Sequence, residues 1–161
     1  MTPAEFKNLF DNHFDEIRNY IWYRCGNESL ASDIVQETFT KLWEKRPYKD
    51  KSNLRALLFK MAGDIFVSNY RKQNSELKFR ATLNHEQETI TPEEELQFNE
   101  LKNKYEEALN KMPENQRVIF LMNRMEKKKY REIAEAVGIG IKAVEKRMSH
   151  ALNFLRQEIN W

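Results

Sequence analysis

The stretch from Tyr130 to Leu152, YREIAEAVGIGIKAVEKRMSHAL, decides the fold of this chain. Its first part carries an apolar face at helical spacing, formed by Ile133, Ala134 and Val137. Gly138 and Gly140 then permit a tight reversal, with Ile139 between them to fill the angle. A second apolar stripe at helical spacing follows, formed by Ile141, Val144, Met148, Ala151, Leu152 and Leu155. Two short helices joined by such a turn form a helix-turn-helix, the motif that places its second helix in a DNA major groove.

The second of these helices has a polar and basic side opposite its apolar stripe. An amphipathic helix with outward lysines is often only a solvated surface, so the charge of the whole segment matters. Residues 111–161 hold eleven Lys and Arg against six Asp and Glu, whereas residues 76–110 hold four against nine. A basic carboxy-terminal segment fits contacts with DNA phosphates. The predicted DNA-binding residues on this helix are Lys142, Ala143, Glu145, Lys146, Arg147, Ser149 and His150.

Helical periodicity recurs along the rest of the chain, and strand patterns are nearly absent. The pattern predicts three helices over residues 4–24, 30–46 and 54–72, and a further group of four that starts at residue 93 and ends with the helix-turn-helix. Thr91, Pro92 and Glu94 form a capping box that begins this second group. We therefore predict an all-α protein of two small domains, residues 1–75 and 93–161, joined by a flexible linker over 76–92. The linker holds too few apolar residues to fuse the two cores, so we expect them to pack separately.

Several function classes lack support in the sequence. His13, His85 and His150 are isolated, no Cys or His cluster has metal-binding spacing, and no glycine loop suits phosphate binding, so neither an enzyme nor a cofactor is indicated. Cys25 is the single cysteine and cannot form an internal disulfide. No apolar stretch is long enough for a secretion signal or a membrane span, which predicts a cytoplasmic protein without direct membrane binding.

Two further motifs suggest what kind of DNA-binding protein this is. Residues 33–44, DIVQETFTKLWE, resemble the polymerase-binding helix of bacterial sigma factors, and residues 112–120, MPENQRVIF, resemble the start of their promoter-recognition domain. With the helix-turn-helix at the right distance, the chain resembles the sigma-70 family, and within it the extracytoplasmic function (ECF) group. The resemblance covers almost the whole chain. It implies core RNA polymerase and promoter DNA as partners, together with a membrane-associated anti-sigma factor.

In the family, the first motif docks on the clamp coiled coil of the polymerase. The apolar arc of this helix leaves a polar and acidic strip on its other side, suited to a basic partner. An ordinary solvated face is the alternative reading, and Trp43 at the edge of the strip is either an interface anchor or part of the core. The predicted polymerase-binding residues are Asp33, Gln36, Glu37, Thr40, Trp43 and Glu44.

The resemblance also implies that the segment after residue 46 and the helix that follows it capture the melted −10 strand. Polar and basic side chains suit phosphates, and an aromatic ring in a loop suits an unstacked base. The predicted residues are Tyr48, Lys49, Lys51, Ser52, Asn53, Arg55, Lys60, Asn69, Arg71 and Lys72.

The sequence departs from the family at two places. Gly63 and Asp64 stand where members commonly have Arg and Asn, which puts the contacts to the −10 strand in doubt. Ala143 stands where many members have Thr, which removes one hydroxyl from the recognition helix but keeps its apolar stripe.

We therefore predict an alternative sigma factor that binds core RNA polymerase, recognises the −35 element as duplex and directs transcription initiation. Two alternatives remain open at this stage. One is a sigma-like decoy that binds an anti-sigma factor without touching DNA, against which the cations Lys142, Lys146 and Arg147 argue. The other is a conventional helix-turn-helix transcription regulator, against which the polymerase-type helix and the lack of a dimerisation heptad argue.

Overall fold

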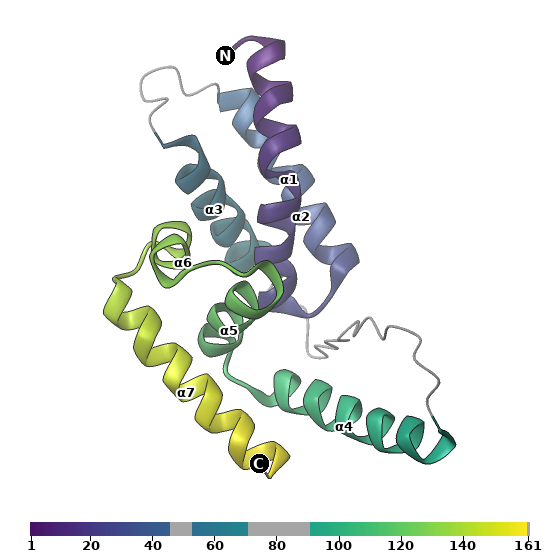
Figure 1. Ribbon diagram of the computed structural model, residues 1–161. Helices are drawn as coiled ribbons and strands as arrows, with labels where there is room; N and C mark the ends of the chain where they lie inside the picture. Colours follow the sequence, from purple (N-terminus) through teal and green to yellow (C-terminus); the bar gives the residue numbers. More distant parts are fainter. Residues whose placement is uncertain (46–52, 71–90, 161) are drawn as a thin grey trace.

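The computed structural model describes residues 1–45, 53–70 and 91–160. Within these ranges every regular element is helical, as the sequence predicts (Figure 1). The elements are α1 (Pro3–Cys25), α2 (Glu28–Lys45), α3 (Leu54–Ile65), the π-helical turn η1 (Phe66–Tyr70), α4 (Pro92–Lys111), α5 (Glu114–Glu126), α6 (Tyr130–Val137) and α7 (Ile141–Ile159). The predicted helix over residues 54–72 is thus shorter as an α-helix, because it changes to π-helical turns from Phe66.

Helices α1, α2 and α3 form the amino-terminal half and lie along one another (Figure 1). Local signals set their ends: Thr2 and Glu5 form a capping box at the start of α1, and Gly26 ends this helix in the left-handed region, with φ 67°. Phe39 of α2 is buried, and the rings of Phe6, Phe10 and Phe14 pack around it. The predicted apolar face of each helix therefore lies toward a shared core.

The carboxy-terminal half contains the predicted helix-turn-helix, formed by α6 and α7. Gly138 ends α6 in the left-handed region, with φ 77°, where a β-carbon would strain the backbone. Gly140 has φ −73°, so the conformational freedom predicted for it is not used. The prediction that Ile141 is buried is also wrong: it is 46% exposed, because it is the first residue of α7 and precedes the part of the stripe that reaches the core.

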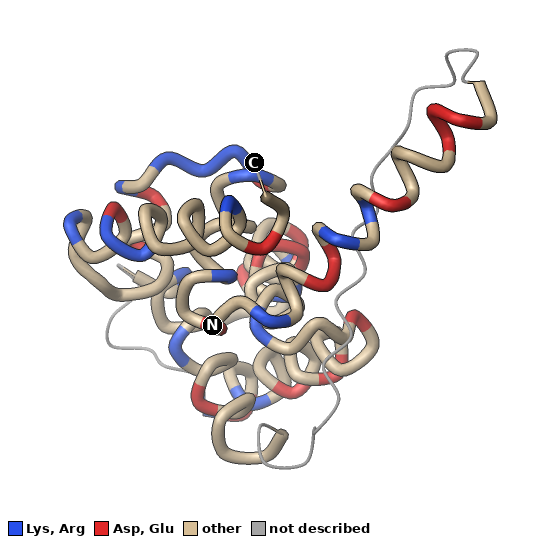
Figure 2. The backbone as a smooth tube through the Cα atoms, turned by 90° about the horizontal axis from the view of Figure 1, so that it is seen from below, with Lys and Arg blue, Asp and Glu red and all other residues tan. Residues whose placement is uncertain are grey.

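Helix α4 begins with the predicted capping box of Thr91 and Glu94. Its carboxy-terminal end packs on α7 through Ala108 and Leu109, whereas its other end projects from the molecule and carries acidic positions (Figure 2). Leu96 and Leu101 on this projecting part are exposed. Most of the predicted linker lies outside the described residues.

The two halves pack against each other, contrary to the expectation of separate cores. Helix α5 lies on α1, and α6 lies on α3 (Figure 1). Buried residues of both halves form one continuous apolar cluster, which includes Ile17 and Ile21 from α1 and Ile119 and Ile133 from the second half. The apolar contacts between the halves therefore come from helices α5 and α6, which follow the linker in the sequence, and the linker itself is not required for them.

Arg117 of α5 lies at the centre of this contact and is only 2% exposed. Its Nε donates to the carbonyl of Tyr23 at 2.8 Å, and its Nη2 donates to the carbonyl of Arg24 at 2.5 Å, both at the end of α1. Its Nη1 donates to the carbonyls of Leu109 and Met112 at 3.2 and 3.3 Å, at the end of α4. One guanidinium thus satisfies carbonyl groups that two helix ends leave without intrahelical partners, and its positive charge lies where two helix dipoles are negative.

We expect Arg117→Met to lower the free energy of unfolding by about 3–5 kcal/mol, because the substitution leaves buried carbonyl groups without donors. Urea denaturation followed by circular dichroism measures this loss. Arg156→Met on the exposed side of α7 is the matched control, for which we expect a change within about 0.5 kcal/mol. Equal stabilities for the two variants would show that Arg117 does not hold the helix ends together.

Candidate functional site

The predicted DNA-binding face of α7 is exposed to solvent. Val144, Met148 and Ala151 are buried beneath it, so the helix is fixed by its opposite side. The exposed residues of the predicted set are Lys142, Glu145, Lys146, Ser149 and His150, and Ala143 is half-buried. Two lysines one helical turn apart therefore project from a firmly packed helix, the geometry that a groove-binding helix needs.

Arg147 lies apart from this face. It is half-buried and lines a cavity of about 450 Å³ between the two halves. Arg24 of α1, Glu114 and Asn115 of α5 also line this cavity. The position of Arg147 on the flank of the helix explains this placement.

The predicted polymerase-binding strip on α2 is also accessible. Asp33, Gln36, Thr40 and Glu44 are exposed, while Ile34, Val35 and Leu42 on the same helix are fully buried. Glu37 is half-buried, pairs with Lys41 at 3.1 Å and accepts a hydrogen bond from the Tyr70 hydroxyl at 3.3 Å. Trp43 is half-buried, and its ring packs edge-on against Phe6 with 5.1 Å between the ring centroids. It thus belongs partly to the aromatic core and partly to the border of the strip.

The residues predicted to capture the −10 strand divide into three groups. Tyr48, Lys49, Lys51, Ser52, Arg71 and Lys72 lie outside the described residues. Lys60 of α3 and Asn69 of η1 are exposed. Asn53 and Arg55 are engaged within the protein: the Asn53 side chain accepts a hydrogen bond from the Ala56 amide at 3.3 Å and caps α3, and Arg55 forms an ion pair with Glu16 of α1.

Gly63 faces the interior, whereas Asp64 is exposed. A β-carbon at Gly63 would lie 3.2 Å from Nη1 of Arg24 and 3.7 Å from the Tyr20 hydroxyl. Gly63 therefore gives room to the Arg24 guanidinium, which also lies over the Phe66 ring at 4.8 Å. Gly63, which differs from the residue common in the family, thus serves the packing of α3 on α1.

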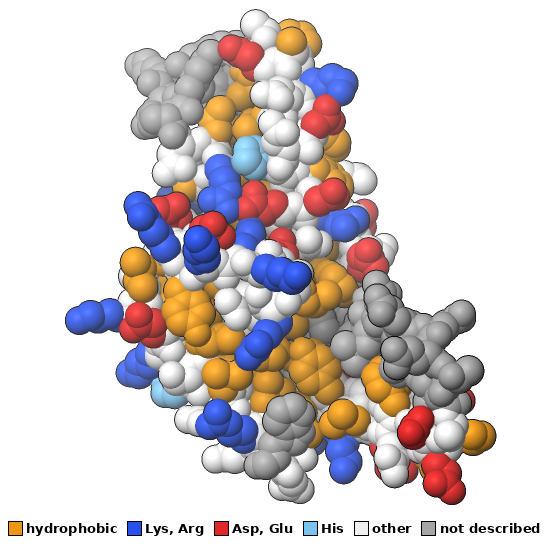
Figure 3. Space-filling view, viewed as in Figure 1, with side chains coloured by type: hydrophobic (Ala, Val, Ile, Leu, Met, Phe, Trp, Pro, Cys, Tyr) orange, Lys and Arg blue, Asp and Glu red, His pale blue; other side chains and the backbone are white. Residues whose placement is uncertain are grey.

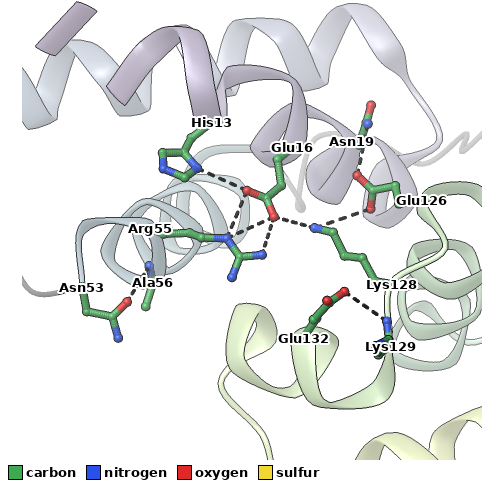
Figure 4. A network of polar contacts seen from close by, with 10 residues as sticks. All are labelled: His13, Glu16, Asn19, Asn53, Arg55, Ala56, Glu126, Lys128, Lys129 and Glu132. Carbon is green, nitrogen blue, oxygen red and sulfur yellow. Dashed lines mark hydrogen bonds and ion pairs between the residues drawn. The ribbon is translucent and has the colours of Figure 1, made fainter. Parts of the chain in front are cut away.

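A polar network that the sequence analysis missed centres on Glu16 (Figure 4). Its carboxylate accepts hydrogen bonds from Arg55 Nε at 3.1 Å and from Lys128 Nζ at 2.6 Å, and His13 Nδ1 lies 3.3 Å from it. Lys128 belongs to the turn between α5 and α6 and lies 3.8 Å from Glu126. The network thus joins α1, α3 and the carboxy-terminal half in a site that is mostly shielded from solvent.

The charges of this network change the acidity of its carboxyl groups. Burial by itself raises the pKa of Glu16, but the hydrogen bonds from Arg55 and Lys128 outweigh burial and lower the pKa to about 2. Burial raises the pKa of Glu126, and the nearby Glu16 charge acts in the same direction against the attraction of Lys128. Glu16 therefore stays ionised at neutral pH and pairs with both Arg55 and Lys128.

A second ion pair crosses between the halves. Arg24 Nε donates to Glu114 Oε1 at 2.6 Å, and the two side chains are 13% and 22% exposed. Both cross-half pairs join residues about ninety or more positions apart, so no local pattern of the sequence could have revealed them. The sequence offers one hint of such a pair. Glu16 is a charged residue close to the apolar residues Phe14 and Ile17 on α1, and a charge in that position needs a partner.

Comparison with known proteins agrees with this arrangement. Residues 9–76 match the family model of sigma-70 region 2, and residues 102–155 match that of sigma-70 region 4. The chain belongs to the sigma-70 family. The region 2 match begins within α1 and includes α2 and α3, and the region 4 match runs from the second half of α4 into α7.

Relatives of this sigma factor include members of the ECF group. It is 24% identical over 152 residues to the RNA polymerase sigma factor YlaC of Bacillus subtilis, covering 90% of this chain and 86% of the relative. It is 28% identical over 132 residues to the ECF RNA polymerase sigma factor EcfG of Rhodopseudomonas palustris, covering 78% and 69% of the two chains. Its function class is that of an alternative sigma factor that directs transcription initiation by RNA polymerase.

A solved structure with the same fold is the sigma factor RpoE of Bartonella quintana, crystallised in complex with the anti-sigma factor NepR. The TM-score is 0.63 at 22% sequence identity, and the match covers 97% of each chain. Among the described residues of the present chain, no helix is long and apolar enough to cross a membrane.

We expect Glu16→Gln to remove part of the acid sensitivity of this sigma factor. The pKa of Glu16 is depressed in the folded state, so its contribution to stability is complete above the ordinary value of 4.5 and is lost as the pH falls toward about 2. Because Glu16 faces His13, Arg55 and Lys128, with Glu126 nearby, the difference between the wild type and the variant reports the Glu16 charge together with its coupling to these groups. Urea denaturation at several pH values between 2 and 7 measures the difference.

The wild type should lose its stability advantage over Glu16→Gln as the pH falls through this window. Asp11→Gln on the exposed side of α1 controls for loss of a carboxylate, since Asp11 pairs only at the surface with Lys7. A constant difference between the wild type and Glu16→Gln from pH 7 to 2 would contradict the assignment.

Proposed function

We propose that this sigma factor uses three separate surfaces in transcription initiation. Helix α7 enters the major groove of the −35 element, the acidic strip of α2 docks on the clamp coiled coil of core RNA polymerase, and α3 with the segment before it captures the melted −10 strand. The observation that carries this proposal is the exposed pair Lys142 and Lys146 above the fully buried Val144 on α7. A helix held so firmly by its apolar side can present side chains to base edges and phosphates at fixed positions.

The placement of the other two surfaces supports the same division. The α2 strip lies on the helix whose apolar side packs on α1 and α3, so a partner can reach it without disturbing the core. Residues 1–75 would act as the polymerase and −10 domain and residues 93–161 as the −35 domain, with 76–92 between them. The factor would act in the cytoplasm as a binding protein without catalytic activity, and an anti-sigma factor would control it, by analogy with the RpoE–NepR complex.

Run-off transcription with purified core polymerase on genomic fragments tests the proposal as a whole. Addition of the protein should produce discrete transcripts that core polymerase alone does not make. Binding to an anti-sigma factor without any transcript would instead identify a decoy.

For the −35 surface, we expect Lys146→Glu to weaken holoenzyme binding to the promoters so found, because it reverses a charge beside DNA without touching the buried stripe. Lys142→Ala and Lys146→Ala should each reduce the slope of log K against log salt by about one unit, the share of one phosphate contact. Footprinting and filter binding measure these effects. Lys7→Glu, on an α1 side chain that is 78% exposed, is the matched control. Footprints over the −35 element that survive all three changes on α7 would exclude this face.

For the polymerase surface, we expect Asp33→Lys and Gln36→Ala to weaken binding of core polymerase with little change in thermal stability, since both side chains are exposed. Asp15→Lys, on an α1 side chain that is 83% exposed, is the matched control for the charge reversal. Fluorescence anisotropy of the labelled factor titrated with core polymerase measures the affinity. Unchanged affinity for both α2 variants would place the docking surface elsewhere.

A further inference from the structure

The glutamates of the carboxy-terminal helices differ in how they are used. Six of them lie on α5, α6 and α7. Five pair within the chain: Glu114 with Arg24, Glu126 with Lys128, Glu132 with the backbone amide of Lys129, Glu135 with Arg131, and Glu158 with Lys111. Among the described residues, Glu145 of α7 is the one glutamate of this group that forms no hydrogen bond or ion pair through its side chain. Its charge is therefore available to a partner outside the chain.

Glu145 shares the exposed face of α7 with two lysines. Lys142 and Lys146 are exposed like Glu145, while Val144 is fully buried, so the helix is held from its opposite side. Figure 3 shows acidic and basic side chains next to one another along the outer edge of α7, at the lower left of the view. The carboxylate thus lies on the surface that we assign to DNA.

The place of Glu145 along α7 brings it close to the bases of a bound duplex. A recognition helix contacts base edges through residues near its amino-terminal end, and Glu145 lies in the first two turns of α7, which begins at Ile141. At 1.5 Å per residue, Lys142 and Lys146 are about 6 Å apart along the helix axis, or about two base steps of 3.4 Å. Glu145 lies between them along the axis and can reach a base pair within this short stretch.

A carboxylate on this surface opposes binding unless a base supplies a donor. DNA phosphates repel it, so an unpaired Glu145 in the groove lowers the affinity for every sequence. The major groove offers two amino donors, N4 of cytosine and N6 of adenine. Adenine places its N7 acceptor beside the amino group, whereas cytosine presents no acceptor on this edge. Guanine and thymine present acceptor oxygens there, so cytosine is the base that a carboxylate favours.

We propose that Glu145 selects a cytosine in the −35 element by accepting a hydrogen bond from its N4 amino group in the major groove. Lys142 and Lys146 supply affinity through phosphates or guanine edges, and Glu145 lowers binding to every sequence that lacks cytosine at this position. The unpaired carboxylate thus gives α7 selectivity at the cost of general affinity for DNA. This inference rests on the function proposed above for α7.

Selection from a promoter library tests the assignment. The probe is a promoter found by run-off transcription whose −35 element is randomised, and it is bound by holoenzyme made with core polymerase. Sequencing before and after binding measures the preference at each position. Wild-type holoenzyme should enrich cytosine over thymine about tenfold at one position, which is within the range of one specific base contact.

Two substitutions of Glu145 separate base readout from general repulsion. Glu145→Gln should change the preference at that position from cytosine to adenine, because a carboxamide pairs with N6 and N7 of adenine together. Glu145→Ala should remove the preference there and leave the other positions unchanged. It should also bind a duplex with a scrambled −35 element about twofold more tightly, since it no longer repels phosphates.

Glu158 supplies the matched control, because it lies near the other end of α7 and pairs with Lys111. Glu158→Gln and Glu158→Ala make the same changes of charge, and both should select the same sequences as the wild type. Circular dichroism confirms that each variant keeps its helices.

A cycle of protein and DNA changes then measures the contact itself. Replacing the selected C·G pair by T·A places the O4 acceptor of thymine against the carboxylate. This exchange should weaken binding by the wild type about tenfold and binding by Glu145→Ala about twofold. Filter binding at one fixed salt concentration measures the four affinities.

The outcomes distinguish this inference from the function on which it rests. The same preferences in the wild type and both Glu145 variants would overturn the inference, and so would a gain of affinity in Glu145→Ala that is equal for all sequences. A base other than cytosine at the position that changes would overturn the choice of base. Sequences that lose their enrichment with Lys146→Glu but not with either Glu145 variant would leave only the function of α7 standing. A library without any enriched sequence would overturn both.

Discussion

The arrangement of this sigma factor depends on the guanidinium of Arg117. A buried cation is costly, and here carbonyl oxygens of two helix ends replace the water that Arg117 loses, with the Glu114 charge nearby. Because those ends belong to α1 and α4, one side chain fixes the position of α5 relative to both halves of the chain. The helix-turn-helix is built on α5, so the orientation of the DNA-binding helix follows from the same contact.

Local features of the fold could be predicted from the sequence. The capping box at Thr91, the turn at Gly138 and the buried stripe from Val144 to Ala151 each depend on residues within a few positions of one another. The exposed residues on α7 and α2 follow from the same periodicity, since they lie opposite apolar residues. The family follows from the motifs at residues 33–44 and 112–120 taken together with the helix-turn-helix.

The contact between the halves could not be predicted in this way. Glu16 and Lys128 are 112 positions apart, one on α1 and the other in the turn between α5 and α6, so no local pattern relates them. Arg55 carries a cationic side chain of the kind that binds phosphate, so the sequence suggests a DNA contact. Its ion pair with Glu16 is visible only in the structure. Gly63 similarly looked like a lost DNA contact, although its lack of a β-carbon is used by Arg24 on the inside of the protein.

The shielding of the cross-half pairs has a consequence for the response to ionic strength. Mobile ions weaken interactions between exposed charges over a Debye length of about 8 Å at physiological salt, but they reach shielded pairs much less. Contacts between exposed lysines and DNA phosphates lose affinity steeply as salt rises. The contact between the halves and any contact of α7 with DNA therefore respond unequally to the same change in salt concentration. A rise in salt would therefore weaken contacts of this sigma factor with DNA before it loosened the contact between the two halves.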